Sequence, residues 1–548
     1  MPTVSAHVAA TLARHIDHVF GVMGNGNAYF LDALERSTDV GYTAVRHEAG
    51  GVVAADAYHR AGGGLAAATS TYGAGFTNTL TALAEAVQAH VPLVLVVGDE
   101  PTSGPRPWDV DQIALASAVG ARTYTVGRAD AAATTIIAIE HALTYRVPTV
   151  LAIPYDVAAL EAGPVPDAPE PRLPQPLTPA GPFAHGAVAE IAAALASAER
   201  PFLLAGRGAW ISDAGAALGE VADAVGALTA STALGRGVFP RAEFDLGVTG
   251  GFGADGAMEL VREADVAVVF GASLNQFTMR FGDLFAPGTR VFQVDVAPAA
   301  THPYVGGFVR GDAGVVAREL ADALQDATSS GWREHVDVPA ARGYAPGEDL
   351  AADGRLDPRS VAARIGALLP EDRVVVSDGG HFIGWANMYW PVASPDRMMM
   401  VGTAFQSIGL GFPSVAGAAQ AQSDATIVLT TGDGGGLMAL ADLETAVRVA
   451  GGRGVAVVWN DAAYGAEVNL YGLKGLAEAP MLIPEVDFAA LAAGVGAEGV
   501  VVRTLADLDR LETWAAEDAA SRPFLLLDCR ISGTVIAPYQ QEIIRVNS

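Results

Sequence analysis

The segment from Thr426 to Gly465 constrains the fold of this chain more than any other stretch. It begins with an apolar run typical of a β-strand, Thr426 to Thr431, which leads into the sequence Gly-Asp-Gly-Gly-Gly. An amphipathic stretch typical of a helix follows, and a second apolar run ends in Asn460-Asp461. A strand, a helix and a strand in this order predict a parallel sheet with helices on its faces. Ligands of such sheets lie at the carboxyl ends of the strands, where both motifs stand.

The residues at these two strand ends suit a metal ion bound to a diphosphate. Glycines let backbone N–H groups approach phosphate oxygens, and the N-terminus of the following helix adds favourable dipole charge. Asp433 and Asp461 supply hard oxygen ligands of the kind that Mg²⁺ or Ca²⁺ prefers. A lone glycine-rich turn after a strand is about as often only a tight connection, so the motif needs support from elsewhere in the chain.

The segment resembles the cofactor motif of the thiamine diphosphate enzymes, the superfamily of acetolactate synthase and benzoylformate decarboxylase. The resemblance implies that Asp433, the side chain of Asp461 and the backbone carbonyl of Ala463 bind Mg²⁺. The family usually has Asn where this chain has Asp461, and Asp remains an oxygen ligand that adds a negative charge. The resemblance also implies cofactor contacts from Gly432, Gly434, Gly435, Tyr464 and Gly465.

A second motif, Arg46-His47-Glu48, stands between a strand-like run and a helix of small residues. Taken alone, an acid at this place is more often a helix N-terminal residue favoured by the helix dipole. The resemblance favours a catalytic role, because thiamine diphosphate enzymes place their activating glutamate in such a segment. It implies that Glu48 hydrogen-bonds N1′ of the cofactor's aminopyrimidine, whose 4′-amino group then acts as the base. A buried carboxyl with a raised pKa could hold the shared proton.

Further glycine-containing blocks are similar to the same family. Gly73-Ala74-Gly75 with Asn78 resembles the turn and helix beside the pyrimidine, although the family's proline is missing. Gly379-Gly380-His381 follows a strand-like run, and the resemblance implies that these residues contact the diphosphate. Taken alone, a single histidine at such a place is more often structural. By the same resemblance, Val401 and Gly402 are expected to offer backbone contacts to the pyrimidine. Ile408 is expected to be the apolar side chain that bends the cofactor. Candidate substrate contacts are Asn25, Ser70, Tyr72 and Gln112.

The 548 residues are too many for one core. The proline-dense stretch from Gly163 to Pro182 is typical of a linker, and a weaker boundary falls near Gly343 to Asp353. We therefore predict three consecutive parallel-sheet α/β domains: a pyrimidine-binding domain at 1–162, a middle domain at 183–330 and a diphosphate-binding domain at 354–535. Expected strands include Leu93–Val97, Pro201–Ala205, Val266–Phe270, Val291–Val294 and Arg373–Val376.

The net charge of −28 excludes some classes of partner. A strongly acidic surface repels nucleic acid and anionic membranes, so we expect neither as a partner. The chain has no unbroken apolar stretch of membrane-spanning length, and its N-terminus lacks a signal-peptide pattern. The single cysteine, Cys529, excludes an intrachain disulfide and a cysteine-based metal cluster. These features predict a cytoplasmic protein.

The resemblance implies a thiamine diphosphate- and Mg²⁺-dependent enzyme that acts on small 2-oxo acids. Two reactions are open, carboligation as in acetolactate synthase and simple decarboxylation as in benzoylformate decarboxylase. The chain lacks an adjacent His-His pair, and a histidine-poor site has no obvious acid for rapid product protonation, which favours carboligation. The alternatives are a 2-hydroxyacyl-CoA lyase or oxalyl-CoA decarboxylase, and a non-catalytic homologue.

Two further expectations come from the family. Its active sites lie between subunits, which implies a homodimer or homotetramer. Some relatives bind a flavin in the middle domain, and Met279 to Asp283 faintly resembles a flavin-contacting stretch. FAD is therefore possible, but the sequence does not predict it.

Overall fold

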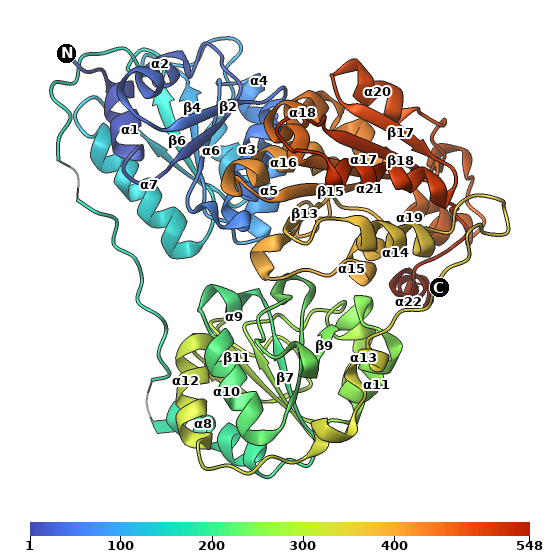
Figure 1. The fold of residues 1–548 in the computed structure, drawn as a ribbon. Coiled ribbons are helices and arrows are strands. Elements are labelled where there is room, and N and C mark those ends of the chain that lie inside the picture. The colour runs from blue at the N-terminus through green and yellow to red at the C-terminus, as the bar shows by residue number, and fades with distance from the viewer. Residues whose placement is uncertain (168, 181, 548) are drawn as a thin grey trace.

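Three six-stranded parallel sheets organise the chain, as seen in the computed structural model, which describes residues 1–167, 169–180 and 182–547 (Figure 1). Every pair of neighbouring strands within these sheets runs parallel. The prediction of three consecutive parallel α/β domains is confirmed. The three boundaries at 1–162, 183–330 and 354–535 stay predictions, and positions 168 and 181 of the expected linker lie outside the described residues.

The N-terminal sheet has the strand order β2-β1-β3-β4-β6-β5. One apolar cluster packs α1, α2 and α7 on one face of the sheet, and a second packs α3, α5 and α6 on the other. The elements are α1 (Val4–Leu12), β1 (His18–Gly21), α2 (Ala28–Ser37), β2 (Gly41–Ala44), α3 (Glu48–Tyr58), β3 (Ala67–Ser70), α4 (Ala74–Thr77), α5 (Leu80–Gln88), β4 (Val94–Asp99), α6 (Gln112–Ala118), β5 (Arg122–Thr125), α7 (Ala131–Tyr145) and β6 (Thr149–Pro154).

The C-terminal sheet repeats this topology, with the order β14-β13-β15-β16-β18-β17. Helices α14, α15 and α21 cover one face, and α16, α18 and α20 cover the other. The elements are α14 (Pro358–Leu368), β13 (Arg373–Ser377), α15 (Ile383–Tyr389), β14 (Met398–Met400), α16 (Gly411–Ala421), β15 (Thr426–Gly432), α17 (Asp433–Met438), α18 (Leu443–Ala450), β16 (Gly454–Asn460), α19 (Gly465–Glu467), α20 (Phe488–Gly494), β17 (Glu498–Val502), α21 (Asp509–Ala516), β18 (Leu525–Arg530) and α22 (Pro538–Asn547).

The N- and C-terminal domains share one apolar core. Helix α3 of the first packs on helix α16 of the second, and both lie in a single buried cluster (Figure 1). The two backbones come very close, since a Cβ at Gly417 would lie 2.0 Å from the carbonyl oxygen of Ala54. A glycine is therefore required there for the two helices to pack this closely.

The middle sheet has the order β12-β11-β10-β7-β8-β9, which is the order of dinucleotide-binding folds. In such folds ligands bind where the order reverses, here between β7 and β10. In this chain the loops at that point close on each other, since a Cβ at Gly206 would lie 2.4 Å from the carbonyl oxygen of Gly271. Contact between loops therefore accounts for these glycines without a flavin. The elements are α8 (Pro182–Ala196), β7 (Pro201–Ala205), α9 (Arg207–Ile211), α10 (Gly215–Val225), β8 (Leu228–Ser231), β9 (Asp245–Val248), α11 (Asp255–Glu263), β10 (Val266–Phe270), β11 (Arg290–Asp295), β12 (Val305–Arg310), α12 (Ala313–Leu324) and α13 (Val338–Ala341).

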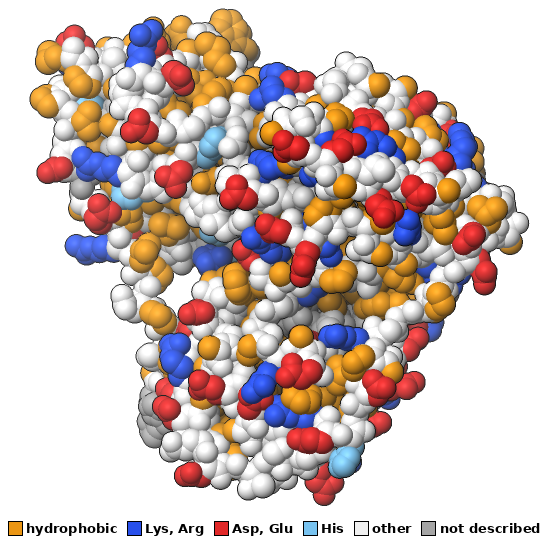
Figure 2. Space-filling model, viewed as in Figure 1, with side chains coloured by type: hydrophobic (Ala, Val, Ile, Leu, Met, Phe, Trp, Pro, Cys, Tyr) orange, Lys and Arg blue, Asp and Glu red, His pale blue; other side chains and the backbone are white. Residues whose placement is uncertain are grey.

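Figure 2 shows acidic and basic side chains interspersed over one face of the molecule. Among the helices of the described residues, we find none with the length and apolar character needed to cross a bilayer.

Candidate active site

Three neighbouring strands of the C-terminal sheet bring the candidate metal and diphosphate residues to one edge. Strand β15 lies between β13 and β16, and each of the three ends in a candidate block. His381 follows β13, Asp433 follows β15 and Asp461 follows β16. The Nε2 atom of His381 lies 2.9 Å from Oδ2 of Asp461. A Cβ at Gly465 would lie 2.4 Å from the His381 ring, so a glycine at 465 allows this packing.

Asp433 has an unusual environment for a carboxylate. Its Oδ1 accepts a hydrogen bond of 2.9 Å from the Gly434 amide, and the residue is only 3% exposed. Its buried Oδ2 has no hydrogen-bond partner among the described residues. Burial, together with the negative charge of Asp461, raises the pKa of Asp433 to about 7. A buried carboxylate oxygen without a donor is costly, and a divalent cation would satisfy it, so the site fits the implied metal.

The remaining parts of the candidate metal site come from Asp461 and the loop after it. Within the described residues, no group of three His, Cys, Asp or Glu side chains could hold a metal ion. A cation here would therefore rely on two carboxylates, a backbone carbonyl and phosphate oxygens, which is how Mg²⁺ is often held. Ala462 has a φ of +61°, which is uncommon for a residue other than glycine, and the Ala463 amide donates to Asp461 Oδ1 over 3.3 Å. These contacts fix the loop that would present the Ala463 carbonyl.

His381 pairs with the carboxylate that Asp461 brings to the site. Burial alone would lower the pKa of His381, but the hydrogen bond to Asp461 and the charges of Asp461 and Asp433 outweigh it, so its pKa is raised. The sequence predicted a contact between His381 and the diphosphate. In the structure its Nε2 atom faces Asp461, and the diphosphate contact stays a prediction.

Asp378 organises the glycine loops of this edge, and the sequence analysis missed it. Its buried carboxylate accepts hydrogen bonds from the amides of Gly379, Gly409 and Leu410, and from the hydroxyl of Thr431, over 2.8 to 3.1 Å. Burial raises the pKa of Asp378 to about 6. The signal in the sequence was an aspartate placed directly between a buried strand and a pair of glycines. Asp378 thereby ties the block at Gly379 to the loop that carries the other candidates.

That loop runs from Val401 to Leu410 and contains three of the predicted cofactor contacts. Gly402 has a φ of +100°, and a Cβ there would lie 2.4 Å from the Ser407 carbonyl oxygen. Val401 is buried, while Ile408 is half-buried and lies near the surface of the single chain. This geometry suits the predicted backbone contacts of Val401 and Gly402 and the predicted role of Ile408 in bending the cofactor. All three roles stay predictions.

Glu48 is the first residue of α3 in the N-terminal domain. Its Oε2 accepts a hydrogen bond of 2.9 Å from the side-chain amide of Asn78, another predicted cofactor contact. A Cβ at Gly75 would lie 3.5 Å from Glu48 Oε1, so the glycine turn borders the carboxyl closely. The sequence analysis expected a buried carboxyl, and this expectation is not met within one chain. Glu48 is half-buried because the start of α3 opens onto the surface.

The four candidate substrate residues fall into two kinds. Asn25 and Tyr72 form an accessible pair, in which the Asn25 amide donates to the Tyr72 hydroxyl over 2.9 Å. Ser70 is buried and donates to the carbonyl of the next residue. Gln112 is also buried, and its amide accepts from Gly73 N–H over 2.8 Å and donates to Gly98 and Asp99. The roles of all four stay predictions. Asn25 and Tyr72 are better placed to contact a substrate, because they are accessible and the other two are buried.

Arg106 is a further residue that the sequence analysis missed. Its guanidinium carbon lies 4.0 Å from the centre of the Tyr72 ring and 4.8 Å from that of Tyr155. Asp109 accepts from it through both carboxylate oxygens. The guanidinium that lies against Tyr72 is therefore already paired with a carboxylate.

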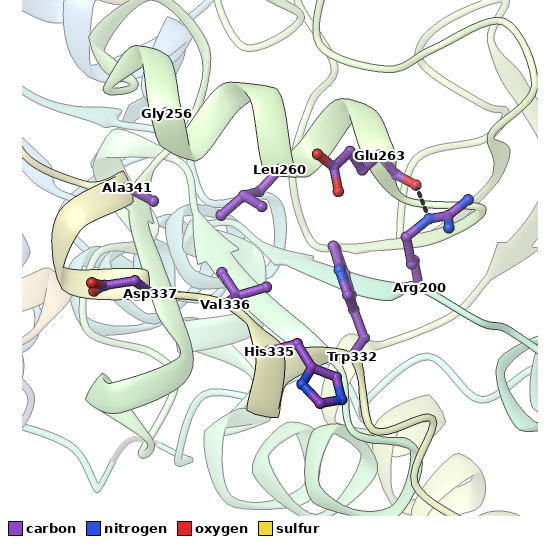
Figure 3. Close-up of a pocket in the computed structure, with 9 residues that line it drawn as sticks. All are labelled: Arg200, Gly256, Leu260, Glu263, Trp332, His335, Val336, Asp337 and Ala341. Atoms are coloured by element: carbon purple, nitrogen blue, oxygen red, sulfur yellow. Dashed lines mark hydrogen bonds between the residues drawn. The ribbon is translucent and has the colours of Figure 1, made fainter.

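An open depression of about 560 Å³ lies in the middle domain, away from all these residues (Figure 3). Trp332 and the side chains of Arg200 and Glu263 line it, and Arg200 Nε donates to the Glu263 carbonyl over 2.6 Å. It contains none of the candidate residues.

Comparison with known proteins agrees with this geometry. Three models of the thiamine pyrophosphate enzyme match the chain: the N-terminal TPP binding domain at residues 2–118, the central domain at 188–320 and the C-terminal TPP binding domain at 378–528. The chain therefore belongs to the thiamine pyrophosphate enzyme family, and its cofactor is thiamine diphosphate.

Individual relatives carry several names. A sulfoacetaldehyde acetyltransferase of Roseovarius nubinhibens is 26% identical, with 100% of this chain and 94% of the relative covered. An acetolactate synthase large subunit of Parasynechococcus marenigrum is 29% identical, with 91% and 83% covered. A solved thiamine diphosphate-dependent 4-hydroxybenzoylformate decarboxylase of Rhodococcus jostii RHA1 has a TM-score of 0.79 at 22% identity, with 97% of this chain and 99% of that chain covered. This last likeness concerns the fold.

Proposed function

We propose that this chain is a Mg²⁺-dependent carboligase that uses thiamine diphosphate to join a 2-oxo acid to a second carbonyl compound, as acetolactate synthase does. The observation that carries the proposal is the unpartnered Oδ2 of Asp433, buried beside Asp461 at the strand ends of a TPP binding domain. A divalent cation would satisfy that oxygen, and a diphosphate would complete the cation's coordination.

Each candidate residue has a role in this proposal. Asp433, Asp461 and the Ala463 carbonyl would hold Mg²⁺, and the glycines after β13 and β15 would admit the diphosphate. Ile408 would be the apolar side chain that bends the cofactor, and Glu48 would hold a proton at N1′ of the aminopyrimidine. Thiamine diphosphate supplies the carbon nucleophile and the electron sink, whereas the protein supplies orientation and electrostatics.

Carboligation rather than simple decarboxylation is favoured by the candidate substrate contacts. Asn25 and Tyr72 present an amide and a phenol, which are weaker acids than an imidazolium, so rapid protonation to an aldehyde has no obvious donor. Relatives named acetolactate synthase and sulfoacetaldehyde acetyltransferase support a transferase. A benzoylformate decarboxylase-like reaction is the second candidate. The likeness to a solved decarboxylase supports a shared fold and does not favour either reaction.

We also propose that the complete site lies between two copies of the chain. Glu48 hydrogen-bonds within its own domain, and the metal candidates lie at the edge of a different sheet. Large apolar side chains are exposed beside both halves, for example Trp108 at 61% in a loop and Met438 at 57% at the end of α17. Such side chains are typical of surfaces that a partner covers. At least a homodimer is therefore expected.

Product analysis tests the proposed reaction. The full chain with thiamine diphosphate and Mg²⁺ is supplied with a panel of 2-oxo acids, with CO₂ release followed and products identified by mass spectrometry. We expect CO₂ together with 2-hydroxy ketone products. Aldehydes alone would establish the decarboxylase instead, and no turnover with bound cofactor would favour an acyl-CoA lyase or a silent homologue.

A further inference from the structure

The loop from Val401 to Leu410 needs support from outside itself. Gly402 and Gln406 both have positive φ values, +100° and +60°, and Gln406 has no glycine freedom to relieve the strain. The tip of the loop, 404–406, is exposed, so little packing restrains it. Asp378 fixes its far end through the amides of Gly409 and Leu410. The Val401 amide donates to the Ser377 carbonyl over 3.0 Å and holds the beginning of the loop, so the exposed tip is the part that needs another contact.

That contact comes from the N-terminal domain of the same chain. Glu85 lies in α5 and is 1% exposed, and its Oε2 accepts a hydrogen bond of 2.7 Å from the amide of Phe405. Arg60 follows the end of α3 and donates from Nη1 to the Met400 carbonyl over 2.9 Å. Arg60 therefore holds the end of β14, directly before the loop, and Glu85 holds the tip of the loop.

Glu85 and Arg60 are themselves joined in a buried network. Arg60 donates to both oxygens of Asp56, over 2.6 and 3.0 Å, and from Nη2 to Oε1 of Glu85 over 3.2 Å. Each oxygen of Glu85 thus has its own donor, one from Arg60 and one from Phe405. Hydrogen bonds to a buried ionised group are among the strongest in proteins, so this network is stiff.

We propose that Glu85 is a positioning residue for the cofactor: by holding Phe405, it keeps Val401, Gly402 and Ile408 in the shape that receives the aminopyrimidine. The inference rests on the proposed function, because it takes those residues as the cofactor contacts. Glu85 is buried and its two oxygens accept from Arg60 and Phe405, so in this proposal it acts through the loop.

The chemistry of Glu85 makes an isosteric test available. A carboxylate accepts two hydrogen bonds through two oxygens, whereas the amide of a glutamine has one acceptor oxygen and one NH₂ donor. In Glu85→Gln, either the Phe405 amide or the Arg60 guanidinium must therefore face a donor. The substitution keeps the side-chain volume, so the fold should persist while the loop loosens.

The experiment uses the full chain and two readouts. Amide hydrogen–deuterium exchange measures the order of peptides covering 400–410 in the cofactor-free protein, and calorimetry measures affinity for thiamine diphosphate with Mg²⁺. We expect Glu85→Gln to speed exchange in that loop and to weaken cofactor binding about tenfold, with Glu85→Ala weaker still. Unchanged affinity in folded Glu85→Gln and Glu85→Ala proteins would overturn the inference.

Asp357→Asn is the matched control. Asp357 is a buried carboxylate that accepts from Arg359 and from two backbone amides, but it contacts no residue of the 401–410 loop. We expect it to lower thermal stability and to leave loop exchange and cofactor affinity unchanged. An equal loss of cofactor affinity in Asp357→Asn would overturn the inference, because the effect would then be general. Failure of the wild-type protein to bind thiamine diphosphate is a separate outcome, which would overturn the proposed function and this inference with it.

Discussion

Glu48→Gln is expected to lower kcat by about 10²- to 10⁴-fold, the range typical of a lost acid–base group. Glutamine keeps the size of the side chain and an acceptor for the Asn78 amide, which lies 2.9 Å away, so the local geometry should persist. Its amide cannot hold the exchangeable proton that the aminopyrimidine requires. Affinity for thiamine diphosphate should therefore change little while turnover collapses.

Two measurements separate this role from a structural one. Hydrogen–deuterium exchange at C2 of the bound cofactor should slow in Glu48→Gln in parallel with kcat. Glu35→Gln changes an exposed glutamate of α2 in the same chemical way and should leave both quantities unchanged. If exchange at C2 remained at the wild-type rate in Glu48→Gln, Glu48 could not be the activating acid.

Asp433→Ala is expected to weaken Mg²⁺-dependent binding of thiamine diphosphate by at least about 100-fold. The substitution removes a buried carboxylate oxygen that has no donor among the described residues, and breaking a buried ionic contact is costly, on the order of 3–5 kcal/mol. Chelation of divalent cations from the wild-type protein should have the same effect. Calorimetry with and without Mg²⁺ measures both.

Asp357→Ala serves as the control for burial, because it also removes a buried carboxylate, whose hydrogen bonds come from Glu348 and Arg359 and not from the candidate metal residues. It should lower stability and leave the Mg²⁺ dependence intact. Binding of thiamine diphosphate by Asp433→Ala with wild-type affinity and wild-type Mg²⁺ dependence would remove Asp433 from the metal site.

Much of the fold could be predicted because the strands of parallel sheets are buried on both faces and form short, nearly continuous apolar runs. Two expected strands, Pro201–Ala205 and Val266–Phe270, have the same bounds in the structure, and Arg373–Val376 is one residue shorter than β13. The candidate metal and diphosphate residues could be located for the same reason. They follow the strands directly, and neighbouring strands bring their ends together.

What the sequence could not provide are contacts between residues far apart in the chain. The hydrogen bond from Phe405 to Glu85 spans 320 positions, and no local pattern marks either partner. His381 and Asp461 were both candidates, yet their pairing follows from the adjacency of β13, β15 and β16, which the sequence alone does not fix. Arg106 stands in an irregular segment after β4, where no periodicity indicates its stacking on Tyr72.

Mixing Glu48→Gln chains with Asp433→Ala chains tests the central claim, that one active site takes its glutamate from one chain and its metal ligands from another. Each variant alone should be inactive. A hybrid dimer then has one site with both Glu48 and Asp433 intact, so random mixing should restore about a quarter of the wild-type activity. Absence of any restored turnover, with hybrid dimers verified by mass spectrometry, would contradict the account.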